Sequence, residues 1–143
     1  MARLRDFMTS NIETVRPDQT VREAARFMQS AETGSIPVCD GDNIVGMITD
    51  RDIAVRGVAA GKGPECSVSE LMSKDIVCAR QDDDAQSVAA KMGEAQVRRL
   101  PVVDENRKLV GMVSLGDLAR DTSGESAQRA LEGVSSTGGQ HLG

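Results

Sequence analysis

Two copies of one hydroxyl and carboxylate pair are the residues best suited to chemistry in this chain. Thr49 precedes Asp52 by three positions, and Ser114 precedes Asp117 by the same interval. Each pair ends a short apolar run that begins with Gly-Met, which predicts a strand leading directly into a helix. At such a junction the hydroxyl can cap the helix, and the carboxylate can return a hydrogen bond to the capping residue.

The same arrangement also has a functional interpretation. A carboxylate held at a helix start can accept both hydroxyl protons of a ribose, while nearby amide and hydroxyl groups donate to phosphate. The two interpretations are compatible, because one carboxylate oxygen can cap while the other binds. The residues alone favour helix caps at Thr49 and Ser114, and they leave open whether Asp52 and Asp117 also bind a ligand.

These pairs belong to a tandem repeat. Residues 7–54 are matched by residues 71–119 at a shift of 64 positions, which becomes 65 after one inserted residue. Met28 thus matches Met92, whereas Thr49 matches Ser114. A unit of this length seldom buries its apolar face alone, so we expect the two copies to form one globule.

Local signals predict the elements that position the pairs. Residues 20–23, Thr-Val-Arg-Glu, form a capping box at the start of one helix, and Asp84 starts its counterpart in the second copy. Two hairpins follow these helices, with strands predicted at 36–39 with 44–49, and at 100–103 with 109–114. Pro37 and Pro101 indicate a strand start or a sheet edge, since proline donates no ladder hydrogen bond.

Composition narrows the function classes. A net charge of −5 and a pI near 4.9 disfavour nucleic acid as the main partner. No apolar run approaches the roughly 20 residues of a membrane span, so we expect a cytoplasmic protein without membrane contact. Three cysteines without paired spacing indicate reduced thiols. The part expected to fold has no histidine, glycine-rich phosphate loop or metal-ligand cluster, so we expect no enzyme activity, no catalytic residue and no metal site.

The repeated pattern of an apolar residue, Pro and Val, then Asp, then Gly-x-x-Thr/Ser-x-x-Asp resembles the CBS domain, named for cystathionine β-synthase. Two copies in one chain resemble a Bateman module. The resemblance implies an α/β (α+β) fold of two β-α-β-β-α repeats, packed by pseudo-twofold symmetry through their sheets. It also implies a regulatory module that binds AMP, ADP, ATP or S-adenosylmethionine in clefts between the repeats, with no required cofactor. Such modules commonly form homodimers, which are discs of four repeats.

The resemblance also implies roles for individual residues. Asp52 and Asp117 would hold ribose, with Thr49 and Ser114 beside them near ribose or phosphate. Residues of the apolar-Pro-Val triplets would line the base pockets, and an isoleucine at the start of each first strand would cover the base. These pocket residues are Ile36, Pro37, Val38, Leu100, Pro101 and Val102, with Ile12 and Ile76 as the covers.

The two copies differ in charge directly before the triplets. Arg98 and Arg99 precede the second triplet, where Gly34 and Ser35 precede the first. In nucleotide-binding members of the family an arginine at this place contacts phosphate, so the resemblance implies Arg99 as the main phosphate ligand and Arg98 as a second. A solvated pair is the alternative. Ser35 stands at the place of Arg99, so the two sites should differ in affinity or in ligand.

The repeat suggests boundaries and leaves one alternative function. We expect one CBS repeat with its following helix and the start of a linker at 1–60, a second repeat at 61–120, and a polar, disordered tail at 121–143. Ligand binding would signal through conformational change to the dimer or to an effector protein. The alternative is a dimeric module that assembles proteins without a ligand. Each copy retains the hydroxyl and the carboxylate, with Asp52 in the first and Asp117 in the second. This retention argues against that alternative.

Overall fold

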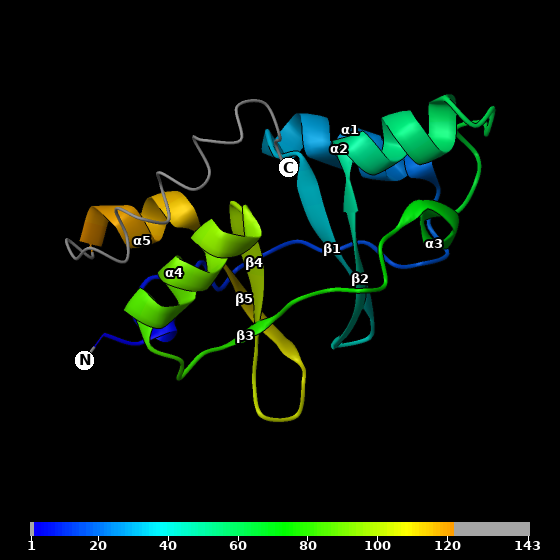
Figure 1. Ribbon diagram of the computed structural model, residues 1–143. Helices are drawn as coiled ribbons and strands as arrows, with labels where there is room; N and C mark the ends of the chain where they lie inside the picture. Colours follow the sequence, from blue (N-terminus) through cyan, green and yellow to red (C-terminus); the bar gives the residue numbers. More distant parts are fainter. Residues whose placement is uncertain (1, 122–143) are drawn as a thin grey trace. The chain divides into compact units, whose positions relative to one another are not determined.

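A computed structural model describes residues 2–121 of the chain (Figure 1). These residues form two compact units. Unit 1 consists of residues 2–12 and 77–121, and unit 2 of residues 13–76. The predicted tail lies outside the described residues, apart from Asp121 at its start. No helix in residues 2–121 is long and apolar enough to cross a membrane.

Unit 2 is built on a β-hairpin covered by helices. Strands β1 and β2 pair antiparallel, with a bulge between Val38 and Cys39. Val15 adds a parallel bridge on the other side of β1. The apolar face of α1 packs on this hairpin, which forms the core of the unit. The elements are α1 (Val21–Ala31), β1 (Ser35–Asp40), β2 (Asn43–Thr49), α2 (Asp50–Asp52), the π-helical η2 (Ile53–Val58) and α3 (Val68–Leu71).

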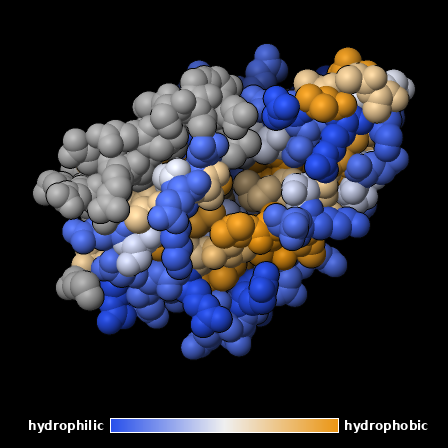
Figure 2. Space-filling view, in the orientation of Figure 1, coloured by the Kyte–Doolittle hydropathy of each residue, from blue (hydrophilic) through white to orange (hydrophobic). Residues whose placement is uncertain are grey.

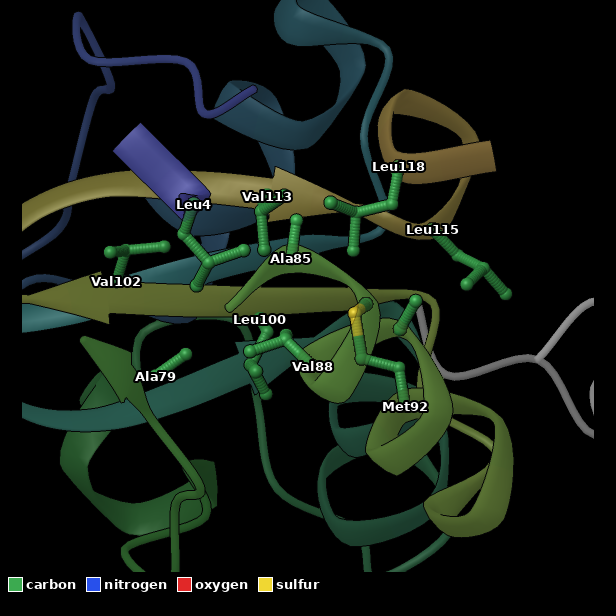
Figure 3. Packing of buried hydrophobic residues seen from close by; sticks show 11 residues of the cluster. Leu4, Ala79, Ala85, Val88, Met92, Leu100, Val102, Val113, Leu115 and Leu118 are labelled. Atoms are coloured by element: carbon green, nitrogen blue, oxygen red, sulfur yellow. The ribbon is translucent and has the colours of Figure 1, made fainter. Parts of the chain in front are cut away.

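Unit 1 repeats this plan around a three-stranded sheet. Strand β4 lies in the centre, parallel to β3 and antiparallel to β5. Helices α4 and α5 supply buried side chains to the core of this unit, including Met92 and Leu118 (Figure 3). The elements are η1 (Leu4–Asp6), β3 (Ala79–Arg80), α4 (Ala85–Ala95), β4 (Arg99–Val103), β5 (Leu109–Ser114) and α5 (Leu115–Asp121). The predicted mixed α/β class and both hairpins are confirmed.

Both predicted helix starts are confirmed. Glu23 N–H donates to Thr20 Oγ1 at 3.2 Å, and Thr20 N–H donates to Glu23 Oε1 at 3.2 Å, which completes the capping box of α1. A hydrogen bond from the Gln19 side chain, with those from Thr20, lowers the pKa of the Glu23 carboxyl. In α4, Ser87 N–H donates to Asp84 Oδ2 at 3.0 Å. The acidic residue at this helix start thus has a structural role.

Removing the α1 cap should destabilise unit 2. We expect Thr20→Ala to lower the free energy of unfolding by about 1 kcal/mol, because Glu23 N–H loses its acceptor at the helix start. Thr20→Ser keeps the oxygen and should retain most of the stability. Urea unfolding of both variants measures the difference, and equal midpoints for wild type and Thr20→Ala would contradict this role.

Each unit also receives a segment that the sequence repeat assigns to the other copy. Thr9 and Met112 exchange two backbone hydrogen bonds of 2.8 and 2.9 Å in unit 1, and Ser73 and Met47 exchange two of 2.8 and 3.0 Å in unit 2. Glycine permits both approaches. A Cβ on Gly111 would lie 2.9 Å from Thr9 O, and one on Gly46 would lie 2.8 Å from Ser73 O.

The compact units therefore do not coincide with the repeats in sequence. The repeat pattern places residues 1–60 together, but residues 2–12 pack with residues 77–121. Leu4 is fully buried in the core of unit 1. Likewise, residues 66–73, from the start of the second copy, belong to unit 2, where Val68 and Leu71 are fully buried. The chain passes between the units after Ile12 and again after Ile76.

Two local expectations need correction. Pro101 lies in the central strand β4 and is its third residue, so it is neither at a strand start nor at a sheet edge. Strand β3 begins to pair only opposite Val102, so no donor is required from Pro101 on that side. The predicted first strand of each repeat also begins later than expected, because Ile12 and Ile76 lie in no strand. The strand is reduced to Ala79–Arg80 in unit 1 and to a single bridge at Val15 in unit 2.

Candidate functional site

The hydroxyl and carboxylate pair of unit 2 forms a complete capping box where β2 runs into α2. Asp52 N–H donates to Thr49 Oγ1 at 3.0 Å, and Thr49 N–H donates to Asp52 Oδ2 at 3.0 Å. The Asp52 side chain is 16% exposed, and its other oxygen, Oδ1, lies 3.9 Å from Arg56 Nε. One oxygen of this carboxylate therefore accepts the capping hydrogen bond, while the second faces the Arg56 guanidinium.

The hydroxyl of the pair in unit 1 also caps its helix. Asp117 N–H donates to Ser114 Oγ at 3.0 Å where β5 runs into α5. Both side chains are half-buried, as are Thr49 and Asp52. The structural role predicted for Thr49 and Ser114 is thus confirmed in both units. Ribose binding by the carboxylates remains a prediction.

The hairpin register brings the residue before each triplet opposite the capping hydroxyl. Ser35 pairs with Thr49 across β1 and β2, and Arg99 pairs with Ser114 across β4 and β5. The backbone is held alike in both copies, since Asp50 N–H donates to Gly34 O at 2.9 Å and Leu115 N–H donates to Arg98 O at 2.8 Å. The copies therefore present different side chains from matching positions.

Serine and arginine at these positions create different environments. Ser35 is 6% exposed, and its hydroxyl oxygen has no hydrogen-bond partner among residues 2–121. A buried hydroxyl without a partner is costly, which makes this group a candidate for contact with a ligand. Arg98 and Arg99 are both exposed. Unit 1 thus offers cationic donors beside its cap, where unit 2 offers a neutral hydroxyl.

The predicted base-lining residues belong mainly to the cores. Ile36 and Val38 lie in the core of unit 2, and Leu100 and Val102 in the core of unit 1, each at most 7% exposed. The neighbouring prolines, Pro37 and Pro101, are also buried. Their role in lining base pockets remains a prediction. Leu100 alone among them also lines a cavity described below.

That cavity lies in unit 1 and has a volume of about 120 Å³. A cavity of about 150 Å³ lined by apolar side chains can hold a benzene ring, so the size is suited to part of a flat ring system. Figure 3 shows Val88, Met92 and Leu100, three of its lining residues, directed into the same region of the unit. The lining also includes Val77, Cys78, Lys91 and Val97.

Most of these lining residues were not predicted as site residues. A comparison of the two copies could have indicated this cavity. Lys91 stands where the first copy has Phe27, and Phe27 packs against the core of unit 2. An exposed lysine in place of a packed aromatic ring leaves space beneath the helix. Burial raises the pKa of the Cys78 thiol, so this cysteine is held in its protonated, less nucleophilic form.

The two isoleucines predicted to cover the base lie where the chain passes between units. Ile12 ends the first segment of unit 1, and Ile76 ends unit 2. Both are half-buried. Each isoleucine therefore belongs to the unit that contains the other copy's carboxylate: Ile12 shares a unit with Asp117, and Ile76 with Asp52. The described residues contain no group of His, Cys, Asp and Glu side chains suited to a metal ion.

The paired hairpins and helix-start caps define a tandem α/β repeat module, and comparison with known proteins identifies the family. The CBS domain model matches residues 4–57 and 68–124. The chain therefore belongs to the CBS domain family. It is 43% identical over 136 residues to the CBS domain-containing protein YhcV of Bacillus subtilis, which covers 94% of this chain and 96% of the relative.

Two similar solved structures contain adenosine compounds. The structure of CBSX2 in complex with AMP has a TM-score of 0.73 at 26% identity, over 84% of this chain and 95% of that one. The CBS domain pair of protein MJ0100, in complex with 5'-methylthioadenosine and S-adenosyl-L-methionine, has a TM-score of 0.74 at 28% identity, over 84% and 94%. CBS pairs related to this chain thus bind both phosphorylated and unphosphorylated adenosines.

Proposed function

We propose that this protein is a regulatory module that binds adenosine-containing ligands and holds their ribose on Asp52 and Asp117. The observation that carries the proposal is the repeated helix start. At Asp52 the half-buried carboxylate accepts from Thr49 N–H, and at the matching position of unit 1 the half-buried Asp117 donates its backbone N–H to Ser114 Oγ. At Asp52, Oδ2 is occupied by the helix and Oδ1 is directed elsewhere. A carboxylate oxygen has acceptor capacity for a ribose hydroxyl, and the fixed orientation lowers the entropy lost on binding.

The contacts beyond ribose are assigned separately. Arg99 is the proposed phosphate ligand in unit 1, because it lies opposite Ser114 and guanidinium pairs well with phosphate. The cavity lined by Leu100 is the proposed pocket for part of a base. Arg99 and Leu100 are consecutive and leave β4 on opposite faces. A single nucleotide would reach both only around the strand end, where Arg99 is the first residue.

Relatives support this ligand class. AMP in CBSX2 and 5'-methylthioadenosine in the MJ0100 pair share an adenosine group, from which an anionic phosphate extends in the first and an uncharged methylthio group in the second. The cationic arginine of unit 1 suits the first kind of extension, and the neutral serine of unit 2 suits the second. We therefore propose that unit 1 favours a phosphorylated ligand and that unit 2 tolerates an uncharged extension.

Binding stoichiometry tests the ribose assignment. We expect Asp52→Asn and Asp117→Asn each to remove one binding event for AMP or S-adenosylmethionine in isothermal titration calorimetry. Asparagine keeps an acceptor for the helix cap but loses the charge. A hydrogen bond to a charged group contributes about 1.5–3 kcal/mol, so affinity at the altered site should fall roughly ten- to hundred-fold.

A neighbouring exposed carboxylate, Asp50, provides the control for this titration. Asp50→Asn changes an exposed carboxylate two residues from Asp52 and should leave the titration unchanged. Unchanged stoichiometry in both site variants would refute the ribose assignment. No saturable heat from the wild type with AMP, ADP, ATP or S-adenosylmethionine would favour the alternative, a ligand-independent module for protein assembly.

Self-association is part of the same proposal. Val55 and Val58 are 51% and 73% exposed on η2, and Figure 2 shows apolar surface at the end of this helix. Exposed apolar side chains near one another favour burial in an interface. We propose that the cytoplasmic form is a homodimer. Light scattering of each titrated sample determines whether stoichiometry must be counted per monomer or per dimer.

A further inference from the structure

Arg56 links the Asp52 carboxylate to the segment that leads out of unit 2. Its Nε lies 3.9 Å from Asp52 Oδ1. Its Nη1 donates to the carbonyl oxygens of Leu71 at 3.4 Å and Met72 at 3.3 Å. All three separations exceed the usual range for N–H···O bonds. The guanidinium, whose side chain is 55% exposed, therefore makes weak contacts with both the carboxylate and the carbonyls.

Arg56 lies in the part of its helix that changes from α-helical to π-helical. After Asp52 the helix continues as the π-helical segment η2, a rare form that often occurs at functional sites. The next residue, Gly57, is buried, and a Cβ there would lie 2.9 Å from Leu71 Cδ1. This close approach of η2 to Leu71 places Arg56 within reach of the two carbonyls.

The Leu71 and Met72 carbonyls belong to a segment that is also hydrogen-bonded to β2. Ser73, which follows Met72, exchanges two backbone hydrogen bonds with Met47. Gly46 allows the segment to lie close, since a Cβ there would be 2.8 Å from Met72 Sδ. The chain leaves unit 2 after Ile76, only three residues beyond Ser73. Arg56 therefore contacts unit 2 close to the point where the chain leaves it.

We propose that Arg56 is a positioning residue that couples ligand occupancy at Asp52 to the rigidity of residues 71–73. The proposal rests on the proposed ribose site. A ribose hydroxyl that donates to Asp52 Oδ1 weakens the pull of the carboxylate on Arg56, and the guanidinium then hydrogen-bonds the Leu71 and Met72 carbonyls more closely. The coupling is reciprocal, so tightening the segment raises affinity at Asp52. The second copy has Asp121 at the position of Arg56, so its sequence carries no guanidinium at this place.

A ligand-free experiment tests the sharing of Arg56. Asp52→Asn removes the charge that attracts Arg56 and keeps an oxygen for Thr49 N–H. We expect this variant to slow amide hydrogen exchange of Ser73 about fivefold or more, since Ser73 reports local opening of the segment. In an Arg56→Met background the same change should have no effect on Ser73. Equal slowing in both backgrounds, or no slowing in either, overturns the proposal.

The ligand arm separates the coupling from the proposed function. At 5'-methylthioadenosine concentrations shown by calorimetry to saturate each variant, exchange of Ser73 should slow in wild type and in the matched control Arg51→Met, but not in Arg56→Met. Arg51 is exposed and adjacent to Asp52, so it controls for charge alone. Slowing that persists in Arg56→Met overturns the coupling and leaves the adenosine site standing. Absence of 5'-methylthioadenosine binding to wild type, with the ligand-free result as expected, refutes the adenosine ligand at Asp52 and leaves the Arg56 link standing.

Discussion

Leu4→Ala is expected to lower the unfolding free energy of unit 1 by about 2–5 kcal/mol, the usual range for a buried leucine replaced by alanine. Leu4 is fully buried although it is only the fourth residue, and it packs in the core that includes Ala85 and Val113 (Figure 3). The substitution removes apolar contacts and leaves a cavity at the centre of that core. Hydrogen exchange should show the loss at α4 and β5, while α1 and β1 keep their protection.

Leu4→Met provides the control for this prediction. Methionine nearly conserves the volume, so we expect a loss below about 1.5 kcal/mol. The two variants differ in the size of the cavity and not in the polarity of residue 4. Destabilisation of α1 and β1 in Leu4→Ala, with α4 and β5 unaffected, would contradict the assignment of residues 2–12 to unit 1.

The second large effect is expected for the phosphate end of the ligand. We predict that Arg99→Gln weakens binding of AMP by roughly ten- to hundred-fold, because a charge-assisted hydrogen bond contributes about 1.5–3 kcal/mol. Adenosine, which has no phosphate, should lose less than about threefold, within the range of 0.5 kcal/mol typical of surface substitutions. The ratio of the two losses, measured by calorimetry, isolates the phosphate contact from any general change in the protein.

A charge control is available in the same unit. Arg80→Gln changes an exposed arginine of β3 and removes the same net charge. It should alter AMP and adenosine affinities little and equally. If Arg99→Gln weakens both ligands to the same extent, the guanidinium does not contact phosphate, and its position opposite Ser114 has a structural role only.

Features that depend on neighbouring residues were predictable from the sequence. The Thr20 and Glu23 capping box, the Asp84 cap and the two hairpins all use contacts within a few residues, and the structure confirms them. The caps at Thr49 and Ser114 belong to the same group. Their second role, in binding ribose, depends on a ligand and cannot follow from local contacts.

Features that depend on distant residues were not predicted. The pairing of Thr9 with Met112 joins positions from opposite ends of the described chain, and no local pattern marks it. A signal was nevertheless present in the repeat, because Gly46 and Gly111 match each other and both occupy strands where glycine is unfavourable. Such a glycine indicates a close backbone approach. The cavity beside Lys91 was missed because its space is defined by a side chain that the second copy lacks.

The discontinuity of unit 1 has a consequence for the order in which the chain folds. Unit 2 is one continuous stretch, residues 13–76, and all its contacts become available as that stretch leaves the ribosome. Residues 2–12 precede unit 2 in the chain, and their partners at 77–121 follow it. Leu4 and Met8 therefore stay exposed to solvent while unit 2 folds. To fold, unit 1 must then close a loop that contains the whole of unit 2. The N-terminal segment is expected to be the last part of the described chain to reach its native contacts and, during synthesis, the part most exposed to aggregation.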